Sequence, residues 1–284
     1  MNNYPSQFEI VALKWGGKSL RSLEHRETFH PVTGPEKEAR LLHVEQQNLL
    51  KRALNCKNKF IVWDVGLGAA ANAIAAIEAL LNIDIPVEIH SFDKSIAPLE
   101  FALQNKNELS YLIPHEEKFF TLLSEKKTSF GENGLWYFHE GDFRQVMQNT
   151  FLPEPHAIFY DPYSPSGNRE MWELEHFSKF RERLGKKIPY LLTNYTRSTA
   201  VRVTLLMAGF YVGTGISIGE KEETTIVSNH LDLIERPLSR AWLENIRASG
   251  NAAPLRRENI FQSPINEEDF QELEKHEQFH FFLR

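Results

Sequence analysis

Residues 64–72, with the sequence DVGLGAAAN, decide the fold of this chain. They join an apolar, β-prone run at residues 60–65 to an alanine-rich run at residues 69–81, which predicts a strand, a tight turn and a helix. Gly66 and Gly68 let the turn adopt backbone angles that other residues avoid, and the first amides of the helix point toward it. This order of elements predicts a ligand-binding loop, although a plain tight turn is an alternative.

Outward from this loop, strand and helix patterns alternate along most of the chain. Further strands are expected at residues 86–92, 135–138, 157–160, 189–193, 210–212 and 224–228. Helices are expected at residues 36–54, 97–107, 115–127, 170–184 and 198–208. Such alternation predicts a doubly wound, Rossmann-like α/β fold, with a parallel sheet covered by helices on both faces. Ligands bind to such sheets at the carboxyl ends of the strands, where the strand order reverses.

The ends of the chain differ from this central pattern. We expect an N-terminal extension over residues 1–34, with a short strand at 8–13, a catalytic domain over residues 35–233 and a C-terminal extension over residues 234–284. The last 27 residues, 258–284, carry a net charge of −5 and include an acidic helix near residues 267–278, so the rest carries −1 of the total −6. The negative total argues weakly against a nucleic-acid ligand, but a nearly neutral body can still hold a basic face.

Composition narrows the class of protein. Hydrophobic residues make up 42% of the chain and charged residues 25%, which is typical of a packed globular protein. Cys56 is the one cysteine, so neither an internal disulfide nor a cysteine metal cluster is expected. No histidine pair falls at metal-binding helical spacing, and we expect no catalytic metal. Without a secretory signal or an apolar run long enough to span a bilayer, a cytoplasmic protein is expected.

Four aspartates stand at the ends of successive expected strands. They are Asp64, Asp93, Asp142 and Asp161. Asp93, at the end of the second strand, is placed to accept hydrogen bonds from both hydroxyls of a ribose, although it could instead cap the next helix. Asp142 could reach an adenine amino group. One such acid is common, whereas four in a row point to a nucleoside ligand.

The loop itself favours one nucleoside over another. A dinucleotide fingerprint places a third glycine where Ala71 stands here. Asp64, two residues before the first glycine, would add negative charge beside phosphates but suits a cationic sulfonium and ammonium. The predicted cofactor is therefore S-adenosyl-L-methionine, bound by Asp64, Gly66, Gly68, Asn72, Asp93, Asp142 and Asp161.

Residues 156–172, HAIFYDPYSPSGNREMW, resemble a known motif. They are similar to Asp-x-Phe-x-Pro-x-x-Asn-Pro-x-x-Trp of the tRNA 5-aminomethyl-uridine methyltransferases, which are the MnmD enzymes and the N-terminal domain of bifunctional MnmC. Segments in the same order that also resemble this family lie at residues 27–44, 64–72, 91–94, 141–142, 193–209 and 219–225. The chain departs from the family at Ala70, where the loop has a third glycine, and at Gly167 and Arg169, which replace the lysine and proline beside Asn168.

The resemblance implies a reaction. Family members transfer a methyl group from S-adenosyl-L-methionine to the primary amine of an aminomethyl group on the wobble uridine of tRNA. It also implies a stand-alone methyltransferase, since no FAD-binding domain follows, with a separate FAD-dependent oxidase upstream as a candidate partner. Two rivals stay open: a small-amine methyltransferase or aminopropyltransferase of polyamine-synthase type, and a non-enzymatic relic that binds RNA or protein.

The residues expected to act on the substrate surround the motif. Asp161, Tyr163 and Asn168 are the catalytic candidates. A carboxylate favours the charged form of a neighbouring amine, so Asp161 is assigned to positioning the amine and offsetting the product charge rather than to acting as a strong base. Tyr163 and Tyr195 could offer aromatic faces to the sulfonium or the base, and Arg197 and Arg202 are expected to contact RNA. The structural alternatives are packing for the tyrosines and a turn for Asn168.

Overall fold

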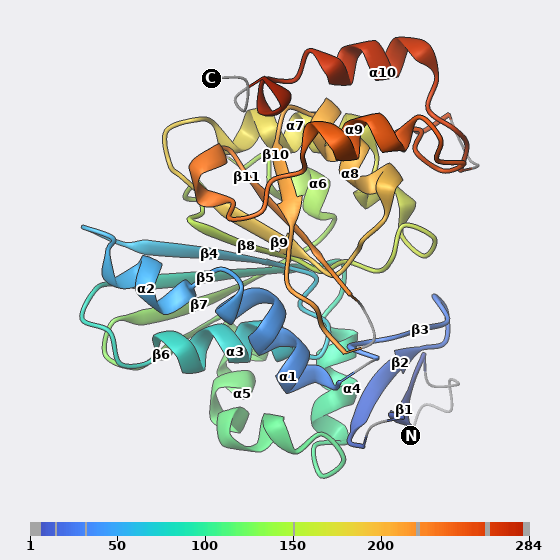
Figure 1. The fold of residues 1–284 in the computed structure, drawn as a ribbon. Helices are drawn as coiled ribbons and strands as arrows, with labels where there is room; N and C mark the ends of the chain where they lie inside the picture. The colour runs from blue at the N-terminus through green and yellow to red at the C-terminus, as the bar shows by residue number, and fades with distance from the viewer. Residues whose placement is uncertain are drawn as a thin grey trace.

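A single eight-stranded sheet forms the centre of the computed structural model, which describes residues 7–14, 16–31, 33–149, 151–219, 222–258 and 262–280. Its order is β10-β11-β9-β8-β4-β5-β7-β6 (Figure 1). The strands are β4 (Phe60–Val65), β5 (Val87–Asp93), β6 (Lys127–Phe130), β7 (Gly134–Glu140), β8 (Ala157–Tyr160), β9 (Leu191–Asn194), β10 (Tyr211–Thr214) and β11 (Thr225–Ser228). The five central strands are parallel, and β6, β10 and β11 add antiparallel edges.

Helices cover both faces of this sheet. One face packs against α1 (Pro35–Ala39), α2 (Leu49–Leu54), α3 (Ala71–Leu80), α4 (Ala97–Gln104) and α5 (Glu116–Glu125). The other packs against α6 (Phe143–Val146), α7 (Leu174–Leu184), α8 (Thr199–Met207), α9 (Arg240–Ile246) and α10 (Glu267–Glu274). Short 3₁₀ segments lie at η2 (Ser110–His115), η3 (Arg169–Met171), η4 (Leu231–Leu233) and η5 (Glu277–Phe279). The predicted doubly wound α/β fold is confirmed.

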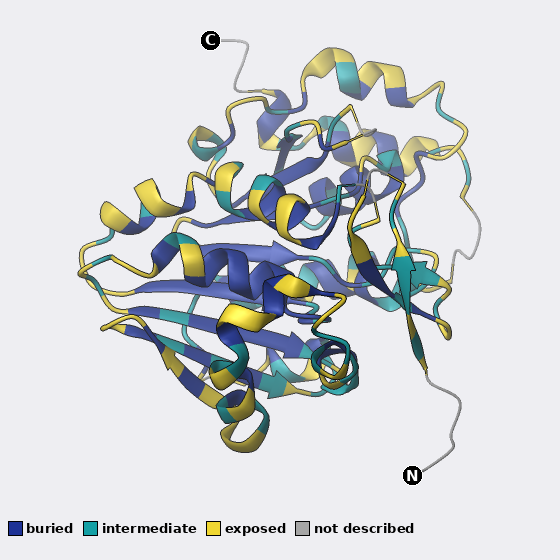
Figure 2. Ribbon diagram, turned by 90° about the horizontal axis from the view of Figure 1, so that it is seen from below, coloured by how far each residue is buried: buried dark blue, intermediate teal, exposed yellow. Residues whose placement is uncertain are grey.

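Strand β4 shows why this sheet is stable. Its alternate residues enter two separate hydrophobic clusters, with Phe60 and Val62 on one face and Ile61, Trp63 and Val65 on the other. All of its residues are buried, as a parallel strand covered on both faces requires. Figure 2 shows the same burial across the central strands.

The order of the strands sets the place of a ligand. From β4 the chain moves to β5 and β7 on one side, then returns to β8 and β9 on the other side. The order therefore reverses between β4 and β8, and a crevice opens at such a point beyond the carboxyl ends of the strands. The glycine loop follows β4, and Asp161 follows β8.

A second, three-stranded antiparallel sheet precedes the main one. It consists of β1 (Phe8–Ala12), β2 (Lys18–Ser22) and β3 (Glu27–Thr28). The expected strand at 8–13 corresponds to β1, whereas β2 and β3 were not expected. Strand β2 reads KSLRS, with one large apolar residue, and β3 has two residues, so neither has a hydrophobic alternation that sequence could reveal.

The prediction of one continuous helix at residues 36–54 is wrong, because the helix is interrupted. The chain forms α1, then a π-helical turn, η1 (Arg40–Glu45), and it breaks at Asn48, whose φ is 48°. Buried polar contacts explain the break, because the side chains of His43 and Gln47 both bond Thr193 of the sheet. The expected helix at 115–127 likewise ends at the left-handed Lys126, after which the unexpected β6 begins.

The C-terminal segment covers an edge of the main sheet. Gln278 is fully buried, and its side chain accepts a hydrogen bond from the Val212 amide at 2.8 Å. The same side chain donates to the carbonyls of Val212 at 2.8 Å and Leu238 at 2.9 Å. It thereby pairs the outward backbone groups of β10, which lies at the edge of the sheet. None of the helices in the described ranges has the length and apolar character needed to cross a membrane.

Replacing Gln278 with alanine should lower the free energy of unfolding by about 2 kcal/mol or more, because buried backbone groups lose their partners. Urea denaturation with an unchanged m-value measures this loss. Gln271→Ala, at an exposed position of α10, serves as the matched control and should change little. Equal stability of the two variants would contradict the role given to Gln278.

Candidate active site

A cavity of about 570 Å³ opens at the reversal point of the main sheet. Its walls include residues 65–69 after β4, residues 92–95 after β5 and residues 161–164 after β8. The small sheet supplies a further wall through residues 27–31, so the cavity lies between the two sheets. Figure 1 shows β1, β2 and β3 beside the same end of the central strands.

The glycines of the loop are required by contacts within the protein. Gly66 has a φ of +96°, and a Cβ there would lie 2.5 Å from the backbone oxygen of Asp161. Gly68 has a φ of +50°, and its Cβ would lie 2.9 Å from the ring of Phe29. The close approach of a ligand was the reason expected from the sequence for these glycines. Contacts within the protein are a second reason for them. Ala70 also has a positive φ, of 64°, at the position where the family has glycine, which costs about 1 kcal/mol for an alanine.

Two of the strand-end acids are held inside the protein. Asp64 is fully buried, and its Oδ2 accepts a hydrogen bond from Ser91 Oγ at 2.7 Å, while its Oδ1 has no partner among the described residues. Burial therefore raises the pKa of Asp64 to about 8. Asp93 lines the cavity, where its Oδ2 accepts from the Gly68 amide at 2.9 Å, and burial raises its pKa as well.

Asp161 lines the cavity directly after β8. Its Oδ2 accepts a hydrogen bond from Asn72 Nδ2, on α3, at 2.9 Å. His30 Nε2 lies 4.0 Å from the same oxygen, and both side chains are largely buried, at 13% and 15% exposure. The fold thus brings two segments that are distant in sequence to the Asp161 carboxylate.

Asp142 has a different environment from the other strand-end acids. Its Oδ1 accepts from the Arg144 amide at 3.0 Å, which caps α6, and both carboxylate oxygens also bond the Arg144 guanidinium. These bonds hold the pKa of Asp142 below its usual range. Gly141 lines the cavity, whereas Asp142 is not among the described lining residues. A contact from Asp142 to adenine stays a prediction.

The aromatic and amide candidates also line the cavity. Tyr163 stacks on His25 with ring centroids 3.9 Å apart, and burial raises its pKa to about 12. Tyr195 is mostly buried, which raises its pKa well above the usual range. Trp172 is fully buried and donates to the Tyr163 carbonyl at 2.9 Å, so it supports the motif from behind. Asn168 lies on the wall beside them.

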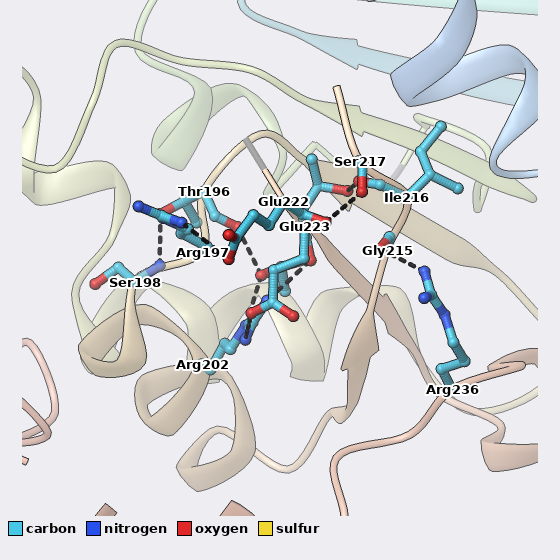
Figure 3. Close-up of polar contacts among 12 residues, drawn as sticks. Thr196, Arg197, Ser198, Arg202, Gly215, Ile216, Ser217, Glu222, Glu223 and Arg236 are labelled. Atoms are coloured by element: carbon cyan, nitrogen blue, oxygen red, sulfur yellow. Dashed lines mark hydrogen bonds and ion pairs between the residues drawn. The ribbon is translucent and has the colours of Figure 1, made fainter. Parts of the chain in front are cut away.

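The two arginines assigned to RNA differ in their environments (Figure 3). Arg202 is 3% exposed, and its guanidinium bonds Glu223 at 2.6 Å, Thr225 Oγ1 at 3.0 Å and the Thr224 carbonyl at 2.9 Å. The assignment of Arg202 to RNA is therefore corrected, because its hydrogen-bonding groups already hold the β10–β11 connection. Arg197 is 59% exposed at the surface and pairs loosely with Glu222 at 3.9 Å. Residues 220–221 of that connection lie outside the described residues.

The small sheet clamps the motif that follows β8. Glu27 of β3 accepts hydrogen bonds from the amide and the hydroxyl of Ser164, the first at 2.9 Å. The Glu27 carboxylate also lies directly against Gly167, where a Cβ would collide with its Oε1. Arg169, in place of the family proline, donates to the Arg256 carbonyl at 2.8 Å and ties the motif to the C-terminal segment.

Four lining residues that were given no role from the sequence come from one short segment. His25, Glu27, Phe29 and His30 all line the cavity, although none was given a role from the sequence. The resemblance of residues 27–44 to the family was the available signal. Their positions depend on the pairing of β2 with β3, which the sequence did not indicate.

The charge of the cavity suits a cationic ligand. The lining carboxylates are Glu24, Glu27, Glu38, Asp93 and Asp161. Lys94 is the one lysine among the described lining residues, and its ammonium lies 3.1 Å from a carboxylate oxygen of Glu170. An excess of carboxylates favours a sulfonium or ammonium and opposes a pyrophosphate. The residues present therefore fit S-adenosyl-L-methionine.

Comparison with known proteins agrees with this geometry. Residues 126–230 match a family described as S-adenosyl-L-methionine-dependent methyltransferase. Among solved structures, MNMC2 from Aquifex aeolicus is 25% identical, with 98% of this chain and 88% of that chain covered and a TM-score of 0.68. No curated protein sequence matches the chain significantly. The family profile confirms the predicted cofactor, and the match to MNMC2 confirms the resemblance to the MnmD and MnmC family.

Two more distant structures also match. A methyltransferase from Agrobacterium tumefaciens is 15% identical over 80% of this chain and 71% of its own, with a TM-score of 0.41. TrmK from M. capricolum, solved with S-adenosyl-homocysteine, is 12% identical over 63% of this chain and 66% of its own, with a TM-score of 0.35. At these TM-scores the two matches add nothing to the assignment.

The stability of the protein should fall as pH rises if Asp64 titrates as its burial indicates. The folded protein keeps this proton up to about pH 8, whereas an unfolded aspartate loses it near about pH 3.9, so the folded state binds more protons between these values. Urea unfolding should show that the free energy of unfolding of the wild type is lower at about pH 9 than at about pH 5. The Asp64→Asn variant should show a smaller difference between the two pH values. The exposed control Asp84→Asn should retain the wild-type loss. If the free energy of unfolding changed equally with pH in all three proteins, the burial of an acid at this position would be contradicted.

Proposed function

We propose that this chain, an S-adenosyl-L-methionine-dependent methyltransferase, methylates the primary amine of an aminomethyl group on the wobble uridine of tRNA. The observation that carries the proposal is the position of Asp161. Its carboxylate faces an acidic cavity beside the cofactor loop, and it opens the motif that resembles the aminomethyl-uridine methyltransferases. The similarity to MNMC2 supports the same substrate class.

The cofactor would be held by the loop and the strand-end acids. Gly66 and Gly68 shape the loop, and Asp93 offers a carboxylate to the ribose hydroxyls beside the Gly68 amide. Asp64 and Asn72 lie behind the loop, next to Asp161. When bound, S-adenosyl-L-methionine supplies an electrophilic methyl group.

The substrate amine would be positioned by Asp161. Asn72 holds one carboxylate oxygen in place, which fixes the direction in which the carboxylate can accept a hydrogen bond from the amine. The negative charge also offsets the positive charge that the nitrogen carries after methylation. Tyr163 and Tyr195 keep their protons and add aromatic walls that favour cations.

The RNA would approach over an exposed rim. Arg197 follows Tyr195 after a single residue, so it joins the cavity wall to the surface. A phosphate could replace its weak, exposed pairing with Glu222 at little cost. A separate FAD-dependent oxidase acting upstream would belong to the same proposal as the source of the aminomethyl group.

A small amine is the alternative substrate. The acidic cavity would attract a polyamine, and the body of the protein outside its acidic end is nearly neutral. A non-enzymatic relic is disfavoured, because the glycine loop, Asp93, Asn72 and Asp161 all keep the arrangement that methyl transfer would use.

Replacing Asp161 with asparagine should lower kcat/KM by about 10²-fold or more, because the amine loses its anionic partner. Affinity for S-adenosyl-homocysteine, measured by calorimetry, should change little. Asp232→Asn, at an exposed position, is the matched control and should keep full activity. Normal turnover by the Asp161→Asn variant would show that the charge of Asp161 has no part in catalysis and that the residue has only a structural role.

The substrate class can be tested with labelled S-adenosyl-L-methionine. We expect label in tRNA that carries an aminomethyl-uridine, and we expect the apparent affinity to fall at least about tenfold between about 50 and 200 mM salt, because phosphate contacts release counterions. Spermidine should remain unlabelled. Labelling of spermidine alone, with weak dependence on salt, would replace the proposed substrate with a small amine.

A further inference from the structure

We propose that His30 accepts the proton of the substrate ammonium before methyl transfer. This inference rests on the proposed function only in that the substrate is a primary amine. An ammonium has no lone pair with which to attack the methyl group, so a proton must leave first. Asp161 alone would oppose that loss, since a carboxylate stabilises the ammonium beside it.

The position of His30 suits this task. The residue follows β3 and lines the cavity, and its Nε2 lies 4.0 Å from Asp161 Oδ2. An amine held by Asp161 would therefore be within reach of the imidazole. Because the side chain is only 13% exposed, little water competes for the proton.

The backbone holds the imidazole in an unusual place. His30 has a φ of +46°, a left-handed conformation that costs a residue other than glycine about 1–2 kcal/mol. The preceding residue, Phe29, is fixed on both sides, since its amide donates to the Leu20 carbonyl at 2.8 Å and its carbonyl accepts from Ser19 Oγ. Its ring also contacts the loop at Gly68. Strain that the surroundings enforce in this way is common where a side chain must be aimed at a reacting group.

Several other groups on the cavity wall are poor proton acceptors. Tyr163 and Tyr195 have raised pKa values and already carry their protons. Lys94 is a cation paired with a carboxylate. Glu27 is occupied by the amide and hydroxyl of Ser164.

The second histidine of the wall is already engaged. His25 contacts the Gly167 carbonyl through Nδ1 at 3.1 Å and stacks on Tyr163. It supports the motif, whereas His30 is the histidine within 4.0 Å of Asp161.

Carboxylates and neutral groups surround His30. Asp161 faces it from the end of β8, and Glu38 lines the same cavity from α1. His43, behind it on η1, is fully buried, and burial lowers its pKa to about 3, so it stays neutral and does not repel an imidazolium. Tyr195, which lines the same cavity, also stays neutral.

The proton balance explains why a histidine beside Asp161 helps. One N–H bond of the ammonium breaks, its electron pair stays on nitrogen, and the proton bonds to Nε2 of His30. Asp161 then faces an imidazolium instead of an ammonium, so it keeps a cationic partner throughout. The nitrogen forms its new N–C bond as the C–S bond of the sulfonium breaks with its electron pair going to sulfur. The products are a secondary ammonium and a neutral thioether, and the imidazolium later releases its proton to solvent.

The test uses His30→Gly, because glycine adopts the left-handed backbone without strain and leaves room for a small molecule. At about pH 7 we expect kcat/KM to fall about 10²-fold. The deficit should shrink toward about pH 10, where a primary amine arrives deprotonated. Added imidazole should restore activity, whereas pyrazole, similar in size but a far weaker base, should not. Affinity for S-adenosyl-homocysteine should match the wild type.

Two further variants keep the outcome interpretable. His30→Asn also tolerates the left-handed backbone and should show the same deficit, while the exposed control His230→Gln should behave as the wild type. A deficit in His30→Gly that is constant with pH and is not rescued by imidazole would overturn the proposal and leave His30 a positioning residue. So would full activity of that variant at neutral pH.

The two proposals fail in different ways. Methylation of spermidine instead of tRNA, with imidazole rescue of His30→Gly, would refute the tRNA substrate and support His30. Methylation of tRNA by His30→Gly at the wild-type rate would support the substrate and refute His30.

Discussion

The close approach of the glycine loop to the end of β8 is the contact on which the site depends. Gly66 lies against the backbone of Asp161 so tightly that a Cβ would meet the carbonyl oxygen at 2.5 Å. Because the two strands are parallel neighbours at the reversal of strand order, this contact brings the helix after the loop under the Asp161 carboxylate. Asn72 can then reach it. The glycine loop after β4 and the motif after β8 are thus joined by one backbone contact.

The small N-terminal sheet completes the cavity that the main sheet only begins. Glu27 binds the Ser164 amide and hydroxyl, and Phe29 packs on Gly68. Strand β3 and the turn after it therefore contact both the motif that follows β8 and the glycine loop that follows β4. At the two departures from the family motif, Gly167 lies against the Glu27 carboxylate and Arg169 binds the C-terminal segment.

Burial of like charges gives the cavity its selectivity. Burial raises the pKa of Asp64 and of Asp93, and the nearby Asp161 and Asp93 carboxylates raise the pKa of Asp64 further. A cation in the cavity would relieve this repulsion, whereas a phosphate would increase it. The same acidity creates the difficulty that an amine must overcome before it can attack, because carboxylates hold it in the charged form.

The sequence by itself determined the features that arise from local patterns. Alternating apolar runs predicted the parallel sheet, and the positions of Asp64, Asp93 and Asp161 at strand ends placed them at one edge, because all parallel strands end there. The tertiary structure alone decided which distant segments meet. His30 approaches Asp161 only through the short strands β2 and β3, and Arg202 turns inward to Glu223 although it was expected to contact RNA. Periodicity reports which face of an element is buried, but it carries no information about contacts between loops far apart in the chain.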